Sequence, residues 1–276
     1  MEIFLQQLVN GLILGSIYAL IALGYTMVYG ILGLINFAHG EVVMIGAMTT
    51  IMFLKMLVQM QTGLPAGVLI TLAVMAALPV CALLGYTLER VAYRPLRNAP
   101  RLSPLITAIG LSIILQNLAM IIWGRNYAAF PPILDTVPMH IAGAAITPLQ
   151  VGIVILALVM MAGLWLLVDR TRIGRAMRAV SQNPAAARLM GVNVDSIISI
   201  TFVLGSMLGC LAGVMVSANY GQAHASMGFM LGLKAFSAAV LGGIGNLLGA
   251  MIGGVLLGLI ESIGAGYIGD FTGGFL

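Results

Sequence analysis

The sequence predicts an all-α membrane protein, a polytopic transmembrane helical bundle of about seven or eight spans with broken or re-entrant helices. Of the 276 residues, 61% are hydrophobic and only 7% are charged, and the mean hydropathy is +1.10. A soluble domain carries roughly 25% charged residues, so this chain has too little charge to cover a surface in water. Apolar runs of spanning length recur along the chain, which indicates a single transmembrane domain over residues 1–276.

The first apolar run extends without a charge from Glu2 to His39, which is longer than the ~20 residues that one spanning helix needs. Because glycines interrupt its second half, we expect one span at about 7–29, followed by a broken or re-entrant piece, GILGLINFAHGE. The next spans are expected at about 41–60, at 66–88 with a kink at Pro79, and at 103–123.

The second half of the chain continues this pattern. A proline-containing loop at 124–147 precedes a fifth span at about 148–168 and a sixth at about 197–219. Residues 220–233 are polar and contain glycine, so we expect no helix there. A seventh span is expected from about Lys234 to Glu261, with GGIGN as a candidate break.

Nine of the twelve Lys and Arg residues fall in two loops, 89–101 and 169–196. Positive residues stay in the cytoplasm, and the two spans between these loops allow both to lie there. The 124–147 loop is then outside. Counting back places the N-terminus outside too, unless 30–40 re-enters without crossing. The formal charge of +4 is no sign of nucleic-acid binding, because the arginines lie next to apolar spans.

The 169–196 loop has the local signals of two short helices joined by a break. Residues 172–182 are good helix formers, Asn183 offers an N-cap and Pro184 suits the first helical position. Gly191 is well placed as the left-handed residue that ends the second helix. The loop is therefore either a docking element or a solvated loop whose arginines only orient the protein.

The sequence lacks the motifs of an enzyme. Neither Lys55 nor Lys234 follows a glycine, so no GK[ST] sequence exists and no P-loop binds ATP. Cys81 and Cys210 lie inside apolar segments, and no Cys/His cluster has metal spacing. Nothing in the sequence places a catalytic Ser/His/Asp set, so we expect neither an enzyme nor a metal site.

Five polar residues in or near apolar segments are candidates for a substrate path: Asn36, His39, Glu41, Lys234 and Asn246. Charges at membrane depth are costly and usually face a cavity, a partner or the interface. The simpler alternatives are that Glu41 caps its helix and that Lys234 extends to the interface. Asn246 could line a broken helix at GGIGN.

Glycines recur every four residues in two spans, at Gly205, Gly209 and Gly213 and at Gly245, Gly249 and Gly253. Such small faces let helix backbones approach closely in lipid. We therefore expect tight helix packing at these faces.

Several segments carry a resemblance to a known family: NGLILGSIYALIALGYTMVYGILGLINFAHGE, ERVAYRPLRNAPRLSPLITAIGLSIILQN, GRAMRAVSQNPAAARLMGVNVDSI and GLKAFSAAVLGGIGNLLGAMIGG. The chain resembles the H-type permease of branched-chain amino-acid ABC importers along nearly its whole length. The resemblance implies a bacterial inner-membrane subunit that pairs with an M-type permease, two cytoplasmic ATPase subunits and a periplasmic amino-acid-binding protein. It implies no cofactor in this chain, because ATP binds to the partner subunits.

By the same resemblance, the segment 174–191 corresponds to the cytoplasmic loop that contacts an ATPase. Its candidate coupling residues are Gly174, Arg175, Arg178, Ala179, Asn183, Ala186 and Gly191. The resemblance also implies contact with the M-type permease, which we expect partly at the glycine face that contains Gly249. Family members usually continue past the position of Phe275 with a further span, whereas this chain stops at GGFL, which leaves the span number open.

Two other functions stay open at this point. Urea or amide importers use closely similar permeases, so the substrate is the least specific part of the resemblance. A membrane channel or scaffold without an ATPase partner is an alternative of a different class.

Overall fold

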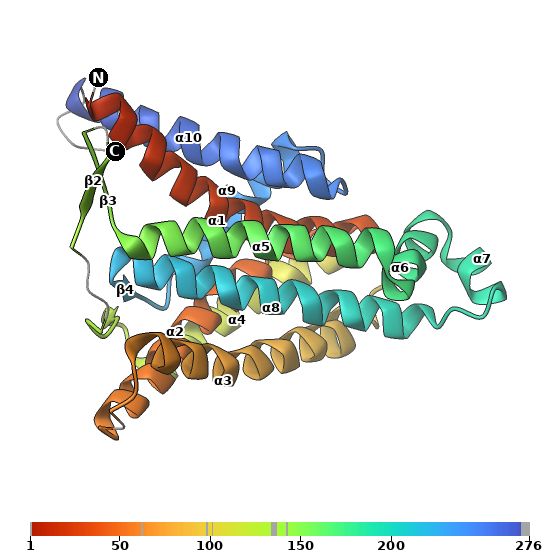
Figure 1. Ribbon diagram of the computed structural model, residues 1–276. Helices are drawn as coiled ribbons and strands as arrows, with labels where there is room; N and C mark the ends of the chain where they lie inside the picture. Colours follow the sequence, from red (N-terminus) through yellow and green to blue (C-terminus); the bar gives the residue numbers. More distant parts are fainter. Residues whose placement is uncertain are drawn as a thin grey trace.

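The computed structural model describes residues 2–61, 63–97, 99–100, 102–133, 137–141 and 143–271. Arg101, in the first basic loop, and Phe275, at the end of the chain, lie outside these ranges. The described chain is a helical bundle (Figure 1) that contains seven helices long and apolar enough to cross a membrane, together with the shorter apolar helix α9 (Met227–Leu241). This confirms the predicted fold class.

The helices follow the expected order. The long helices are α1 (Glu2–Leu32), α2 (His39–Gln59), α3 (Ala66–Thr87), α4 (Leu102–Trp123), α5 (Pro148–Arg170), α8 (Val194–Tyr220) and α10 (Leu247–Phe271). The π-helix η1 (Leu88–Tyr93) continues α3, and the short helices α6 (Arg172–Gln182) and α7 (Pro184–Leu189) lie between α5 and α8. Two small antiparallel pairs, β1 (Ala128–Ala129) with β4 (Gln222–Ala223) and β2 (Met139–Ile141) with β3 (Ala144–Ile146), complete the fold.

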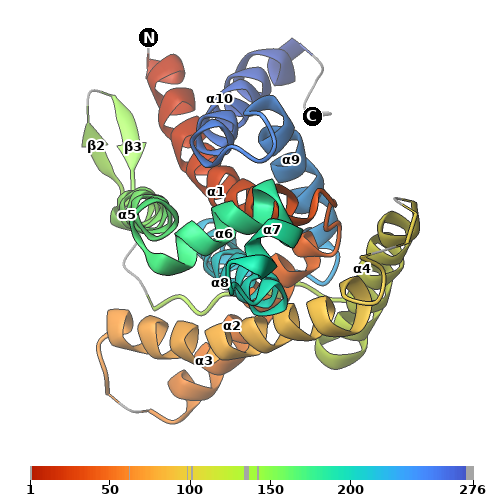
Figure 2. The same cartoon turned by 90° about the vertical axis from the view of Figure 1, so that its right-hand side faces the viewer.

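The bundle has a buried centre and an exposed periphery. Most of α1, α2 and α8 is buried, whereas less than a third of the apolar stretch of α3, α4, α5 and α10 is buried. Figure 2 shows these four helices around the outside of the centre, with α6 and α7 in front. A helix that is apolar on all sides suits either a protein core or lipid, so the difference between the two groups comes from tertiary packing.

The two basic loops lie at one end of the bundle, which we call the basic end. There the ion pair between Arg97 and Asp195, 2.5 Å long, joins the loop after η1 to the start of α8. At the opposite end, the side chain of Gln6 hydrogen-bonds the backbone of Ala145 at 3.1 and 2.8 Å, and Ser262 donates to the carbonyl oxygen of Gln7. The N-terminus and the 124–147 loop therefore share the end opposite the two basic loops, as predicted, and α1 crosses the bundle.

The first helix break lies between α1 and α2. Gly33 has a φ of +63°, which glycine adopts without steric cost, and α2 begins at the buried residue His39. There is no room for a side chain on Gly24 of α1, because a Cβ atom there would overlap the His39 imidazole. The second helix therefore starts inside the bundle, in agreement with the expected broken piece.

The second break corrects the sequence interpretation. Residues 220–233 are not all outside a helix, because α9 begins at Met227, and Lys234 lies in the middle of it. The candidate break at GGIGN is confirmed, because α9 and α10 are joined there by a turn in which Gly243 and Gly245 have φ values of +84° and +97°. Lys234 does not mark the start of a span, because Glu261 on α10 pairs with it and allows it to lie inside a helix.

The glycine faces pack within this chain. A Cβ atom on Gly213 would overlap the carbonyl oxygen of Val43 on α2, and one on Gly254 would overlap the backbone of Ala19 on α1. This confirms the predicted close packing for Gly213, and Gly253 likewise packs on α9, whereas Gly245 lies in the turn before α10 with nothing within 4 Å of a Cβ. A Cβ atom on Gly249 would overlap the carbonyl oxygen of Gly242, just after α9, so this glycine packs within the chain. Its expected contact with a second permease stays a prediction.

We expect Gly213→Leu to destabilise the folded protein, because α8 and α2 would have to separate. Overpacking of a core costs about 1–3 kcal/mol or more, and here the obstructing atoms are backbone. Thermal unfolding of the detergent-purified protein measures the effect. Gly152→Leu is the matched control, since nothing lies within 4 Å of a Cβ at Gly152. Equal stability of the two variants would contradict the close contact.

Candidate functional site

Three of the predicted path residues meet in the centre of the bundle, and we call Asn36, His39 and Glu41 the polar core. All three side chains are buried. The hydroxyl of Tyr93 donates to Asn36 Oδ1 at 2.8 Å, and the ring of Tyr25 packs against that of His39 with centroids 4.9 Å apart. The break between α1 and α2 therefore places polar side chains deep among apolar helices.

Glu41 lies where the N-termini of two helices meet. It belongs to the first turn of α2, and Gly228 in the first turn of α9 lies so close that a Cβ there would be 2.5 Å from Glu41 Oε2. Gly40 packs directly on the Gly228 backbone. Helix N-termini carry partial positive charge, so both helices stabilise this carboxylate.

The hydrogen bonds of Glu41 go beyond helix capping. Its Oε1 accepts from the Ser112 hydroxyl of α4 at 2.9 Å, and Ala38 at the N-cap has no side-chain cap bond. Within the described residues, neither Glu41 Oε2 nor His39 Nε2 has a hydrogen-bond partner. A buried polar atom without a partner costs free energy, so the polar core keeps bonding capacity that the packed chain does not use.

The structure does not bring Lys234 and Asn246 to the polar core. The ammonium of Lys234 pairs with Glu261 Oε1 at 2.5 Å, and Glu261 Oε2 accepts from the Tyr18 hydroxyl at 3.0 Å. Asn246 Oδ1 accepts from the backbone N–H of Gly249 at 3.2 Å, in the first turn of α10. Sequence reasoning did not select Tyr18 or Glu261, although a lone acid in a spanning helix is a recognisable signal.

The helix–break–helix at the basic end agrees with the local sequence signals. Asn183 Oδ1 accepts from the N–H of Ala186 at 3.0 Å, Pro184 opens α7, and Gly191 has a φ of +82°. Thr171 caps α6 by accepting from the N–H of Gly174 at 3.1 Å. Both short helices are thus held by their own caps.

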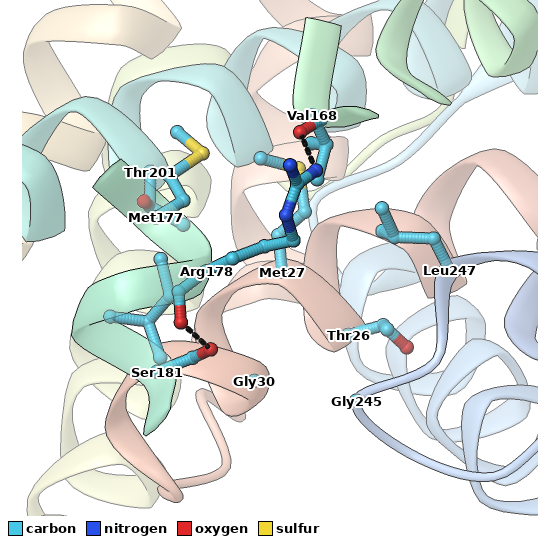
Figure 3. A pocket seen from close by; sticks show the side chains of 11 residues that line it. Thr26, Met27, Gly30, Val168, Met177, Arg178, Ser181, Thr201, Gly245 and Leu247 are labelled. Carbon is cyan, nitrogen blue, oxygen red and sulfur yellow. Dashed lines mark hydrogen bonds between the residues drawn. The ribbon is translucent and has the colours of Figure 1, made fainter. Parts of the chain in front are cut away.

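Helix α6 folds back onto the end of α5. Gly174 is turned inward, because a Cβ atom there would overlap the carbonyl oxygen of Val168. Figure 3 shows Arg178 extending across a cavity to the same carbonyl, and its guanidinium also donates to the carbonyl of Asp169 at 3.3 Å. The cavity lies between α6 and the basic ends of α1, α8 and α10. Arg178 therefore fastens α6 to α5 within the chain.

The free surface of the two short helices carries apolar side chains that sequence reasoning missed. Leu189 is 90% exposed and Met190 is 84% exposed. Six of the predicted coupling residues are also exposed: Arg175, Arg178, Ala179, Asn183, Ala186 and Gly191. The sequence signal for this surface would have been two neighbouring apolar residues in a loop outside the spans. An exposed apolar patch with a polar rim indicates a binding surface.

A buried acid organises the other part of the basic end. Glu89 in η1 is fully buried, and its carboxylate accepts from Arg97, from Arg94 at 3.3 and 3.4 Å, and from Ser199 of α8 at 2.7 Å. The same Arg97 pairs with Asp195. This network joins the end of α3 to the start of α8, a few residues beyond α7.

Comparison with known proteins adds to this geometry. A family model described as branched-chain amino acid transport system / permease component matches residues 7–272. The chain belongs to this family. It is thus a multi-pass membrane protein and a permease component, with seven apolar helices of spanning length in its described part.

Two relatives are similar to this chain over most of their length, and a third over about half of its length. The high-affinity branched-chain amino acid transport system permease protein BraD of Pseudomonas aeruginosa is 47% identical over 272 residues, which cover 97% of this chain and 88% of that protein. LivH of Escherichia coli K12, of the same description, is 45% identical over 96% of this chain and 87% of that protein. The autoinducer 2 import system permease protein LsrC of Klebsiella pneumoniae is 35% identical over 59% of this chain and 48% of its own. No solved structure matches the chain.

We expect Glu89→Gln to lower the thermal stability of the protein strongly. Removing one partner of a buried ion pair costs about 3–5 kcal/mol, because the other charges lose their partner. Asp169→Asn is the matched control at the same end, since Asp169 pairs with Arg170 and Arg178 on an exposed surface, where pairs contribute about 0–1 kcal/mol. Unfolding temperatures in detergent test the difference. A Glu89→Gln variant as stable as Asp169→Asn would contradict the network.

Proposed function

We propose that the chain is one of two permease subunits of an ATP-driven importer of leucine, isoleucine and valine in a bacterial inner membrane. In this proposal an M-type permease completes the translocation path, two cytoplasmic ATPase subunits supply energy, and a periplasmic binding protein delivers the amino acid. The observation that carries the proposal is the exposed apolar pair Leu189 and Met190 on capped helices at the basic end, in a chain whose relatives are branched-chain amino acid permeases.

Energy from ATP has to enter this chain through a protein contact, because the sequence contains no P-loop. Helices α6 and α7 suit that contact, since their caps and the Arg178 bonds to α5 make them stiff. Helix α8 begins directly after them and packs against α1 and α2 in the buried centre. A displacement of α7 would therefore move a helix that contacts the polar core.

The polar core is the proposed lining of the gate. A branched-chain amino acid keeps a charged amine and a charged carboxylate during transit, so some polar lining is required. Asn36, His39 and Glu41 lie at the break where α2 and α9 start. Opening the close contact between Gly40 and Gly228 would expose the unused bonding capacity of Glu41 and His39.

Uptake by the reconstituted complex tests the proposed function. The complex of this chain with its neighbouring permease, ATPases and binding protein is placed in liposomes with labelled leucine or labelled urea. ATP-dependent accumulation of leucine but not urea is expected. Accumulation of urea would favour the urea or amide importer, and passage without ATP would favour a channel.

We expect Ala186→Trp to uncouple the complex, because a large side chain on the exposed face of α7 would block close insertion into an ATPase groove. ATP hydrolysis would no longer depend on loaded binding protein, or the ATPase would dissociate. Ala162→Trp is the control, since Ala162 is an exposed alanine on the apolar surface of α5. Normal substrate-stimulated hydrolysis and uptake with Ala186→Trp would place the coupling contact elsewhere.

We expect Glu41→Gln to reduce uptake while the complex still assembles. The substitution keeps the shape and the bond from Ser112, but it removes the negative charge. Uptake of labelled leucine is compared with co-purification of the other subunits, and Ser112→Ala serves as the control that removes the bond and keeps the charge. Normal uptake with Glu41→Gln would mean that Glu41 is only a structural helix-end residue.

A further inference from the structure

An ion pair lies inside the apolar helices, away from the polar core. Lys234 of α9 pairs with Glu261 of α10 at 2.5 Å, and the Tyr18 hydroxyl of α1 holds the second carboxylate oxygen at 3.0 Å. The two side chains are only partly buried, because that of Lys234 is 39% exposed and that of Glu261 is 32% exposed. Charges at membrane depth are not stable against lipid tails, so they face a water-filled cavity or protein.

Each member of the pair lines its own cavity. Lys234 lines a cavity of about 370 Å³, together with Tyr18, Tyr220 and the apolar side chains of Met227 and Met230. Glu261 lines a second cavity of about 320 Å³, together with several amides. Tyr220 borders both cavities. Volumes of this order are typical of sites for small molecules.

Both cavities belong to the end of the bundle opposite the basic end. The first is also lined by Tyr127, after α4, and by His224, in the connection between α8 and α9. The second is lined by Gln150 in the first turn of α5. Lys234 lies about two helical turns beyond the start of α9. Under the proposed function, this end receives the amino acid.

We propose that Lys234 and Glu261 form an entry site for a zwitterionic aliphatic amino acid, an inference that rests on the proposed function. The ammonium of Lys234 takes the α-carboxylate and the carboxylate of Glu261 takes the α-ammonium. The apolar wall of the first cavity, with Met227 and Met230, accepts the aliphatic side chain.

The charge balance suits capture and release. The ion pair carries no net charge, and neither does the zwitterionic amino acid. Binding of the amino acid between Lys234 and Glu261 therefore leaves no unpaired charge, which would be costly. Both side chains are partly exposed to the cavities, so the pair can open without leaving either charge fully buried. Burial lowers the pKa of His224, which lines the same cavity, and so favours its neutral form.

The pair is not needed to hold α9 against α10. These helices already pack through Gly242 against Gly249 and through Ala238 against Gly253. A structural pair would resemble Glu89 with its arginines, whose carboxylate is fully buried and accepts from three side chains. The exposure of Lys234 and Glu261 to two cavities indicates a site that binds a ligand.

The test measures leucine uptake per ATP hydrolysed in the reconstituted complex, at saturating loaded binding protein. With Lys234→Met or Glu261→Gln, we expect this ratio to fall by roughly tenfold, as for the loss of a charge-assisted hydrogen bond, while stimulated hydrolysis continues. Lys234→Arg keeps the charge and should retain most uptake. Ser237→Ala, an exposed change one turn away on α9, should behave as wild type.

The outcomes separate this inference from the proposed function. A wild-type complex that accumulates no leucine contradicts the proposed function itself. A wild-type ratio in the Lys234→Met and Glu261→Gln variants overturns the entry site alone. If a single variant fails to assemble, the double variant Lys234→Met with Glu261→Gln leaves no unpaired charge, and it decides the matter. An assembled double variant with a low ratio supports the site, whereas a wild-type ratio or failed assembly overturns it.

Discussion

Helix backbones in the centre of this bundle are in direct contact at glycine, and this contact determines where the chain can bury charge. Gly40 of α2 lies on Gly228 of α9, so two helix N-termini meet beside the carboxylate of Glu41. Any side chain at either glycine would separate the two helices, and with them the partial positive charges that stabilise the carboxylate. The break after α1 is tolerated in a membrane for the same reason, because its backbone is covered by protein.

The ion pairs at the two ends of the bundle differ in how deeply they are buried. At the basic end, Glu89 is fully buried and accepts from two arginines and a serine, which makes a stiff connection between η1 and α8. At the opposite end, Lys234 and Glu261 stay partly exposed to cavities. A stiff end suits the transmission of force from a partner, whereas an open end with a weak ion pair suits exchange with a polar solute.

Local signals could be predicted from the sequence, and contacts between distant residues could not. The capped helix break at 183–191 follows from Asn183, Pro184 and Gly191 alone, because each acts within a few residues. The start of helix α9 was predicted wrongly at Lys234, because a charged residue favours the end of a span. The residue that pairs with Lys234 lies on α10, 27 residues away, and could not be found from the local sequence. The burial of Glu89 could not be predicted from its place in a basic loop, because its bond to Ser199 joins residues 110 apart. The polar core was found as a cluster, but its contacts with Tyr93 and Ser112 were not.

Helix α8 connects these regions physically. Its first turn is capped by Asn193, which accepts from the N–H of Ser196 at 3.1 Å, and Asp195 beside it pairs with Arg97. One face then packs on α2, where Gly213 meets the carbonyl of Val43 and Cys210 meets Gly46. Because the two backbones are in close contact, no flexible side chains lie between the helices at these points. A rigid displacement of α8 would therefore displace α2 as well. Because α2 begins at His39 and carries Glu41 in its first turn, a displacement at α7, as proposed above, would reach the polar core through helices alone.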